Sequence, residues 1–387
     1  MTPSPAPGTP GWLALRNDQA ALALLLDEGP LTRNRIGELT GLSKPTAAQI
    51  VARLEEAGLI RTAGELSAGR GPNAVTYDVR LDHTLGVAID VDETVLRATV
   101  VDARGSQHPV ATVALDTAHS RSAEGDVRRG IEAACAAAGV DSAAIVEIVI
   151  GVQAATDPAA DRLNFTDTLD GWPMQNARGE LEAGLGIAVT LENDVNLAAI
   201  AERAEGAGTD AAGFALLWLG EGLGLSIDLD GAILHGATGG AGEIGYLPAP
   251  RTAMAIDPDA EDLQELVGGS AVARAASTAL GTPLDYPHAL EALASVPEQE
   301  RILPALAARI AFALTPVIAV LDPSLVILGG PTGVAGGAPL ADAVSAALRA
   351  SSSWNPIVHT TGAPADAVLL GARHVLVSRL RGRILPD

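Results

Sequence analysis

The stretch Gly86–Asp102, GVAIDVDETVLRATVVD, consists of two apolar, alternating runs joined by a turn of Asp92, Glu93 and Thr94. Alternation with a period of two predicts a β-hairpin, with strands over 85–91 and 95–102. Proteins that hold a nucleotide between two such hairpins usually have glycines in this turn, because backbone N–H groups can then surround a phosphate. The two carboxylates found here repel phosphate instead.

The hairpin begins a pattern that occurs twice along the chain. In the first half it is followed by a strand near 110–115, a helix over 122–138 and the strand AIVEIVIGV. In the second half the corresponding strands are expected at 214–220, 223–229, 232–235 and 325–330. The repeat predicts two similar α/β lobes, over 83–195 and 196–387, with the last helix able to return to the first lobe. Ligands of such sheets bind in the cleft between lobes.

A helix-turn-helix pattern precedes the lobes, within residues 16–80. A helix over 17–28 ends at Gly29, Thr32 caps a second helix, and Ser43 caps a third. The third helix has one apolar stripe, and its opposite face carries Lys44, Thr46, Gln49 and Arg53. Together with Ser43, these residues are expected to contact DNA. Two strands then surround a Gly-rich tip with Arg70, which is typical of a wing that reaches DNA. An ordinary three-helix subdomain with a solvated polar face is the alternative.

The distribution of charged residues also changes between the segment 16–80 and the rest of the chain. The net charge is −22, from 25 basic and 47 acidic residues. The segment 16–80 contains eight of each, so the remaining 17 basic and 39 acidic residues carry the whole −22. A neutral segment before an acidic body indicates two units with different partners, and DNA is the partner expected for the first.

Composition limits the other possibilities. A chain with 48% hydrophobic and 19% charged residues is typical of folded globular proteins. Its single cysteine, Cys135, lies in an apolar helical run and excludes an internal disulfide or a thiolate zinc site. No run reaches the apolar length of a membrane span, and the first residues, MTPSPAPGTPG, show no signal pattern. We therefore expect a disordered Pro-rich tail over 1–15 and a cytoplasmic protein.

Four stretches carry a resemblance to a known family: GLSKPTAAQIVARLEEAGLI, LENDVNLAAIAE, LDGAILHGATGGAGEIG and LDPSLVILGG. From about residue 16 to 382 the chain resembles the repressor branch of the ROK family (repressors, open reading frames and sugar kinases). The resemblance implies a winged helix-turn-helix followed by a two-lobed, actin/hexokinase-like (ribonuclease-H-like) α/β body. It also implies a homodimer or tetramer, which suits a palindromic operator.

The resemblance also assigns residues to a sugar site. It implies that Asn193 and Glu243 bind sugar hydroxyls and that Asp194 is the remnant of a general base. The alternative is that Asn193 and Asp194 only cap the helix over 194–207. The pattern departs from the family at three positions: Tyr246 replaces a histidine, Gln264 aligns with a glutamate although Glu265 adjoins it, and Thr168 replaces an asparagine. Because the family's zinc-binding histidine and cysteines are missing, we expect no metal and no cofactor.

On the nucleotide side, the resemblance implies a first turn of the form D-x-G-G-T. Asp90 and Thr94 remain, whereas Asp92 and Glu93 replace the glycines, and Glu221 interrupts the second turn, GEGLG. A carboxylate about 4 Å from a phosphate charge costs roughly 4 kcal/mol at an effective dielectric constant of 20. We therefore expect the nucleotide site to be lost.

The sequence as a whole predicts a DNA-binding transcriptional regulator, a repressor, with a non-catalytic body that senses a carbohydrate or related polyol. Gln49 is the expected base reader, since glutamine can pair bidentately with adenine. Two alternatives stay open: an ATP-dependent sugar kinase with a fused regulatory head, and a regulator that binds no small molecule.

Overall fold

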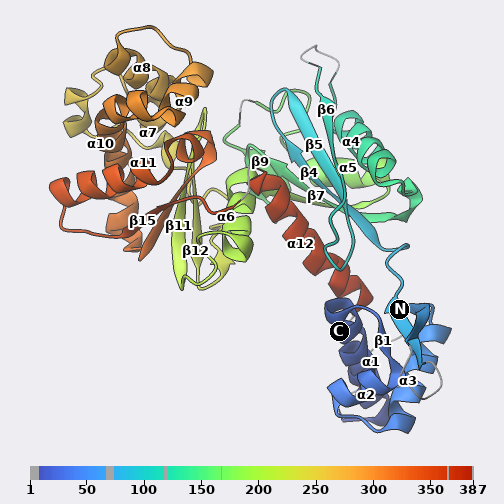
Figure 1. The fold of residues 1–387 in the computed structure, drawn as a ribbon. Coiled ribbons are helices and arrows are strands. Elements are labelled where there is room, and N and C mark those ends of the chain that lie inside the picture. Colours follow the sequence, from blue (N-terminus) through green and yellow to red (C-terminus); the bar gives the residue numbers. More distant parts are fainter. Residues whose placement is uncertain (1–7, 67–73, 117–120, 167, 364–365, 386–387) are drawn as a thin grey trace.

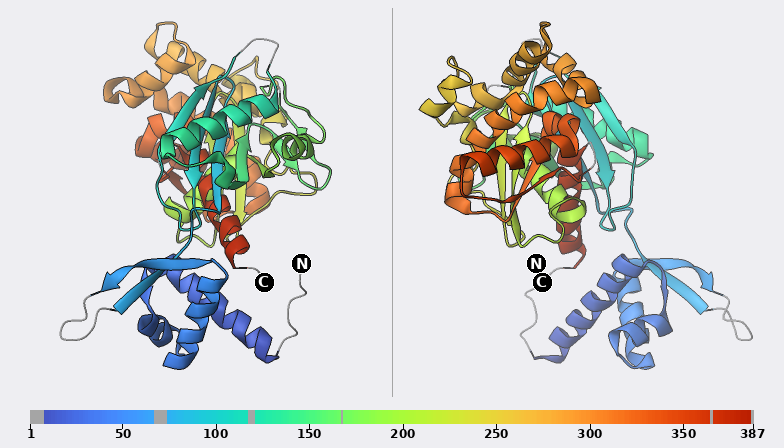
Figure 2. Two further views of the ribbon diagram at one scale, coloured as in Figure 1. Left: turned by 90° about the vertical axis from the view of Figure 1, so that its right-hand side faces the viewer. Right: turned by 60° about the vertical axis from the view of Figure 1, so that its left-hand side comes forward.

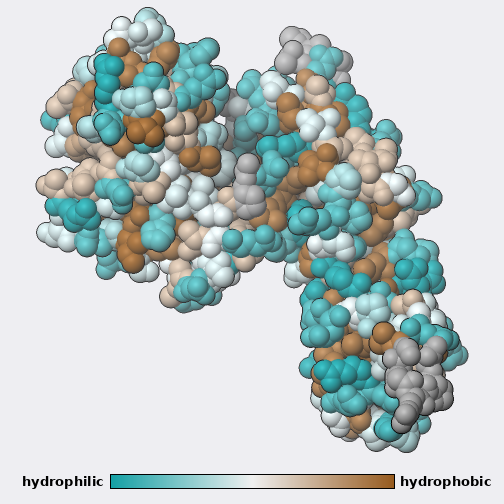
Figure 3. All heavy atoms as spheres, viewed as in Figure 1, coloured by the Kyte–Doolittle hydropathy of each residue, from teal (hydrophilic) through white to brown (hydrophobic). Residues whose placement is uncertain are grey.

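The computed structural model describes residues 8–66, 74–116, 121–166, 168–363 and 366–385. A small head lies below two α/β lobes that stand next to each other (Figure 1). The molecular surface is hollowed between the upper parts of the lobes (Figure 3). The fold class expected from the sequence is confirmed.

The head contains three helices and a three-stranded sheet of order β1-β3-β2. Thr32 and Ser43 cap the second and third helices, as predicted, through their side-chain oxygens. The stripe on the third helix is buried, and it packs against the first helix and the sheet. The elements are α1 (Pro10–Glu28), β1 (Leu31–Thr32), α2 (Arg33–Thr40), α3 (Lys44–Glu56), β2 (Ile60–Leu66) and β3 (Ala74–Val79).

One expectation about the head is wrong. Residues 10–15, assigned to a disordered tail, form the beginning of α1. The helix starts here because the Thr9 side chain accepts a hydrogen bond from the Trp12 N–H, and Pro10 occupies a first-turn position where its missing N–H costs nothing. Residues 1–7 of the expected tail lie outside the described residues.

The first lobe is a five-stranded sheet of order β10-β7-β4-β5-β6. The opening hairpin forms as predicted, with β4 antiparallel to β5 and parallel to β7. Cys135 is a buried free thiol in α4. The elements are β4 (Leu85–Val91), β5 (Val95–Val101), β6 (Val110–Ala114), α4 (Ala123–Ala138), η1 (Ser142–Ala144), β7 (Ile145–Val152), β8 (Ala155–Asp157), β9 (Arg162–Asn164), α5 (Ala177–Leu185) and β10 (Ala188–Asn193).

The second lobe repeats this arrangement in a sheet of order β13-β12-β11-β14-β15, again with an antiparallel hairpin beside parallel strands. The expected boundary at 195/196 falls in the first turn of α6, the helix that leads from β10 into this lobe. The elements are α6 (Asp194–Glu205), β11 (Gly213–Leu219), β12 (Leu223–Leu229), β13 (Ala232–Ile233), η2 (Ile244–Tyr246), η3 (Arg251–Ala255), α7 (Leu263–Val267), α8 (Gly269–Leu280), α9 (Tyr286–Ala294), α10 (Val296–Leu321), β14 (Leu325–Gly329), α11 (Gly330–Ser351) and β15 (Ile357–Thr360).

Helix α10 is, among the described residues, the one helix that is long and apolar enough to cross a membrane by length and composition alone. In this fold its apolar side chains, such as Ile310 and Leu314, belong to the core of the second lobe. Its buried Arg309 pairs with Asp257 at 2.8 Å. The helix is therefore a core element whose buried arginine is paired with a carboxylate.

The last helix, α12 (Ala367–Ile384), returns to the first lobe, as the sequence allowed, and packs against α6, β4 and β7 (Figure 1). At Gly371 a Cβ atom would lie 1.9 Å from the Leu197 carbonyl oxygen of α6, so only glycine permits this approach of the two helices. The C-terminal end of α12 points towards the head (Figure 2). There Leu380 and Ile384 share one apolar cluster with Leu25 of α1.

Two arginines add polar contacts to this joint between the head and the first lobe. Arg104, in the turn after β5, donates to the backbone oxygens of Leu25 and Leu26 at 2.6 and 3.1 Å, and to Asp78 of β3 at 2.7 Å. Arg381 of α12 pairs with Asp27 of α1 at 2.8 Å. The head is thus docked on the first lobe through directional bonds to the C-terminal end of α1.

Candidate DNA interface and ligand site

The outer face of α3 presents the predicted polar residues unequally. Lys44 and Gln49 are exposed, whereas Thr46 is half-buried. The Thr46 N–H donates to the Ser43 hydroxyl oxygen at 3.4 Å, so Ser43 acts as the helix cap. The side chains of Lys44 and Gln49 are therefore more accessible to a binding partner than that of Thr46.

Arg53 has a different environment from the one expected. Its guanidinium makes two bonds to the Asp18 carboxylate of α1, at 3.0 and 2.5 Å. The hydrogen bond to Asp18 raises the pKa of Arg53. This forked pair ties α3 to α1, a structural role that sequence reasoning missed. A contact between Arg53 and DNA stays a prediction, and Arg70 lies outside the described residues.

Asn193 and Asp194 lie where β10 ends and α6 begins. The Asn193 side-chain oxygen accepts from the Asn196 N–H at 3.0 Å, and its amide nitrogen donates to the Ala154 carbonyl at 3.2 Å. Asp194 accepts from the Val195 N–H at 2.9 Å. The capping role left open by the sequence is confirmed for Asn193, and it holds Asp194 at the positive end of the helix.

Three acidic residues from separate elements share an electrostatic environment here. Burial, together with the negative charges of Asp90 and Glu243, raises the pKa of Asp194 to about 7. Burial also raises the pKa of Glu243. A carboxyl group that titrates near neutrality can either donate or accept a hydrogen bond, which suits a hydroxyl-bearing ligand.

A Gly-rich loop delivers Glu243 to this place. Gly239 and Gly242 have φ values of +79° and +96°, in the region that glycine adopts without strain. A Cβ atom at Gly239 would lie 1.9 Å from the Thr156 oxygen of the first lobe, and one at Gly242 would lie 2.0 Å from the Leu225 oxygen of the second. The loop therefore runs in contact with both lobes.

The other predicted ligand residues come from both lobes: Tyr246 and Gln264 from the second, and Thr168 from the first. The Gln264 side-chain oxygen lies beside Gly222 and Gly245, whereas the Glu265 carboxylate accepts from the Glu261 N–H at 2.8 Å. Gln264, not Glu265, thus faces the second turn. Tyr246 is exposed, and Thr168 donates its N–H to the Thr166 hydroxyl at 3.4 Å.

Sequence reasoning missed a second polar pair beside Asn193. Glu192, the preceding residue on β10, bonds to His235 at 2.8 Å and accepts from the Asn196 side chain at 3.0 Å. The hydrogen bond to Glu192 raises the pKa of His235. This pair fixes the segment that follows β13 to the end of β10, close to the predicted ligand residues.

The first nucleotide turn is closed by its own side chains. The Asp92 carboxylate accepts from the Glu93 N–H at 2.7 Å and from the Gln153 side chain at 3.2 Å. The buried Asp90 pairs with Arg97 at 2.6 Å, and Arg97 also pairs with Asp366 at 2.9 Å. A backbone N–H that could bind phosphate and a carboxylate that could bind magnesium are both occupied.

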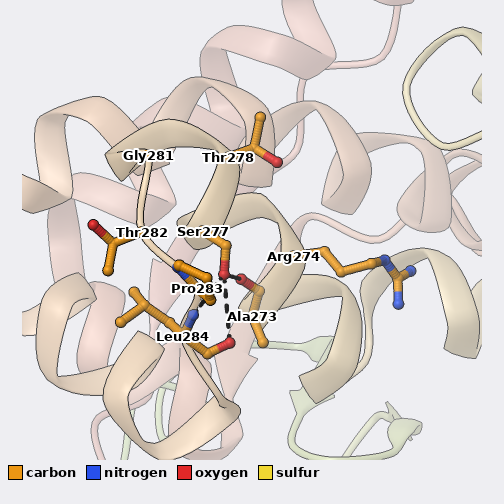
Figure 4. Close-up of a pocket in the computed structure, with 8 residues that line it drawn as sticks. All are labelled: Ala273, Arg274, Ser277, Thr278, Gly281, Thr282, Pro283 and Leu284. Carbon is orange, nitrogen blue, oxygen red and sulfur yellow. Dashed lines mark hydrogen bonds between the residues drawn. The ribbon is translucent and has the colours of Figure 1, made fainter.

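Two hollows elsewhere on the surface contain none of the predicted ligand residues. One, of about 500 Å³, lies by the α8–α9 connection, where Ser277 bonds to Ala273 and Leu284 while Arg274 points away (Figure 4). The other, of about 260 Å³, lies along β10 and includes Arg162 and Arg178. The candidate ligand site is thus assigned from its residues and not from a cavity.

Comparison with known proteins matches both parts of the chain. The sequence pattern of the ROK family matches residues 86–378, and that of winged helix-turn-helix DNA-binding domains matches residues 15–61. The xylose repressor of Bacillus subtilis is 21% identical over 251 residues, which are 60% of each chain. The chain spans less than two thirds of the length of the curated relatives it matches.

Two solved structures show the fold. The ROK hexokinase from Thermus thermophilus is 27% identical, with a TM-score of 0.59 over 77% of this chain and 99% of that one. A ROK family transcriptional regulator, described as a homologue of the E. coli MLC protein, is 17% identical with a TM-score of 0.63. That match covers 96% of this chain and 98% of the regulator, so the shared fold includes the head.

Proposed function

This chain belongs to the ROK family, and we propose that it is a DNA-binding transcriptional repressor whose lobes sense a carbohydrate or related polyol. The observation that carries the proposal is a contrast between two sites. At the first nucleotide turn the Asp92 carboxylate accepts from the Glu93 N–H and Arg97 pairs with Asp90, whereas the helix-turn-helix keeps an exposed polar face on α3. This member of the family therefore keeps an exposed helix-turn-helix face for DNA, whereas its first turn departs from the D-x-G-G-T pattern of the kinases.

In this proposal residues 16–80 are the DNA-binding unit, and the lobes over 83–195 and 196–387 form the sensor, with α12 counted in the first lobe. The protein acts in the cytoplasm as a homodimer or tetramer on operator DNA. Two-fold symmetry of the protein matches two half-sites about one helical turn, or a multiple of it, apart. No cofactor or metal takes part.

Substitutions on α3 test the interface. We expect Gln49→Ala to reduce the preference for operator over scrambled DNA by about 1–3 kcal/mol, because a base contact is lost. Lys44→Ala should weaken binding to both DNAs alike and lower the salt slope by about one, because a phosphate contact is lost. Fluorescence anisotropy at several salt concentrations measures both effects. The exposed Gln175 of the first lobe gives a matched control, and equal effects of Gln175→Ala and Gln49→Ala would refute the interface.

A physical connection joins the ligand site to the head. Helix α6 starts at Asp194 and packs on α12, whose beginning lies beside the Arg97–Asp366 pair and whose end reaches α1. With 18 residues, α12 is about 27 Å long. A ligand that closes the lobes would therefore move the head with α12. The resulting change in operator affinity is of the size usual for coupled sites, about 1–3 kcal/mol.

Sugar kinase activity is the second candidate, favoured by Asp194 at the position of the family's general base. The closed first turn opposes it. We expect no ADP release above background from the full chain with ATP, magnesium and common hexoses, pentoses or N-acylhexosamines in a coupled assay. Turnover that disappears in Asp194→Asn would establish a kinase and overturn the non-catalytic body.

A further inference from the structure

An aromatic contact bridges the two lobes. Phe165 follows β9 in the first lobe, and Tyr246 ends η2 in the second; their ring centroids are 5.2 Å apart with planes tilted by 50°. Both side chains are exposed, at 49% and 57%. The whole chain has only three Phe, three Tyr and four Trp, so a pair of exposed rings in contact is unusual for this surface.

The backbone holds Phe165 in an uncommon conformation. Its φ of 53° lies in the left-handed region, which bulky residues rarely adopt. A Cβ atom on Gly240 of the Gly-rich loop would lie 3.2 Å from the Phe165 ring, so the ring rests against this loop. Residues in such conformations are found where a ligand or a moving part needs the side chain in place. Here the conformation directs the ring towards the opposite lobe.

The two rings are close in sequence to predicted polar residues on both lobes. Tyr246 follows Glu243 by three residues on the η2 turn, a separation of roughly 6 Å along a 3₁₀ helix. Phe165 precedes Thr168 by the same number of residues in the first lobe. Asp194 is close enough to Glu243 for the charge of Glu243 to raise the pKa of Asp194. A polar half and an aromatic half therefore meet in the same region.

We propose that Phe165 and Tyr246 form an aromatic subsite, and that the ligand is an aryl glycoside. Its hydroxyl groups would bind at Asp194 and Glu243, and its aromatic aglycone would stack on the two rings. Ligand sites combine apolar and aromatic walls with a few convergent polar groups, and stacked rings prefer tilted or offset geometry. The inference rests on the proposed function for the polar half of the ligand. A latch that only holds the lobes together is the competing role.

Titration calorimetry on the full chain distinguishes these roles. The probes are matched phenyl and methyl glycosides of glucose, galactose and xylose, in both anomers. We expect at least one phenyl glycoside to bind roughly tenfold more tightly than its methyl counterpart. The affinity ratio should fall to about one in the double variant Phe165→Ala/Tyr246→Ala and should persist in Tyr246→Phe. Leu229→Ala, at a side chain that is also 49% exposed, is the matched control with an unchanged ratio.

Three results would overturn the subsite: equal affinities for phenyl and methyl glycosides, an unchanged ratio in the double variant, or no binding of any phenyl glycoside. Operator binding, measured on the same protein preparations, distinguishes a failure of the aromatic subsite from a failure of the proposed function. Sequence-preferring DNA binding without a phenyl preference would leave the regulator intact and exclude the aromatic subsite. A preference for phenyl glycosides without DNA binding would support the aromatic subsite and exclude the regulator.

Discussion

Asp194→Asn should stabilise the unliganded protein at alkaline pH by about 4 kcal/mol at most, because burial in the folded state raises the pKa of Asp194 from 3.8 to about 7. The sign follows from proton binding. Between these two pKa values the folded state holds a proton that the unfolded state has released, so the stability of the natural protein falls as pH rises. The asparagine variant has no such loss.

Urea unfolding between pH 5 and pH 8 measures this effect. The difference between variant and natural protein should grow by about 2–3 kcal/mol from pH 5 to pH 7 and then level off. Asp170→Asn, at an exposed carboxylate of the same lobe, is the matched control. Parallel stability curves for the natural protein and Asp194→Asn would show that the pKa of Asp194 is not raised in the folded state.

Arg104→Ala should release the head from the first lobe, with a loss of about 2–3 kcal/mol of docking free energy. The substitution leaves the Leu25 and Leu26 carbonyl oxygens and the Asp78 carboxylate without their donor. Faster proteolysis of the segment 80–84, between β3 and β4, reports the release. Arg104→Lys keeps the positive charge but lacks the forked guanidinium group, and should give an intermediate rate of proteolysis.

The same variant tests the path from ligand to DNA. Operator affinity should survive, since α3 is unchanged, while the response of that affinity to ligand should be lost. Arg128→Ala is the matched control, because the Arg128–Glu124 pair is exposed and contributes little. If Arg104→Ala were digested as slowly as Arg128→Ala, the docked head would not depend on these bonds.

Much of the architecture follows from local patterns. Alternation located β4, β5, β11 and β12, and capping residues such as Thr32 and Ser43 located the helices of the head, because these signals act between near neighbours in sequence. The Asp90–Arg97 pair is also predictable from the sequence. The turn over 92–94 fixes the hairpin register, and that register places Asp90 opposite Arg97.

Other features depend on contacts between distant segments and left no local signal. Arg53 was assigned to DNA because it lies on the polar face of α3, yet its partner Asp18 is 35 residues away on α1. The contact of α12 with the head joins Arg381 to Asp27 across 354 residues. Phe165 went unnoticed because its exposure and left-handed backbone become visible only in the folded chain.

The most direct test of the account is anisotropy of the full chain with DNA from its own upstream region, at several salt concentrations and with pooled sugars and glycosides. We expect tight, sequence-preferring binding that Gln49→Ala relaxes and that the pool of sugars and glycosides shifts. Binding that prefers the sequence but ignores the pool would contradict the sensor role of the lobes. Weak binding, indifferent to sequence and unchanged by Gln49→Ala, would contradict the regulator itself.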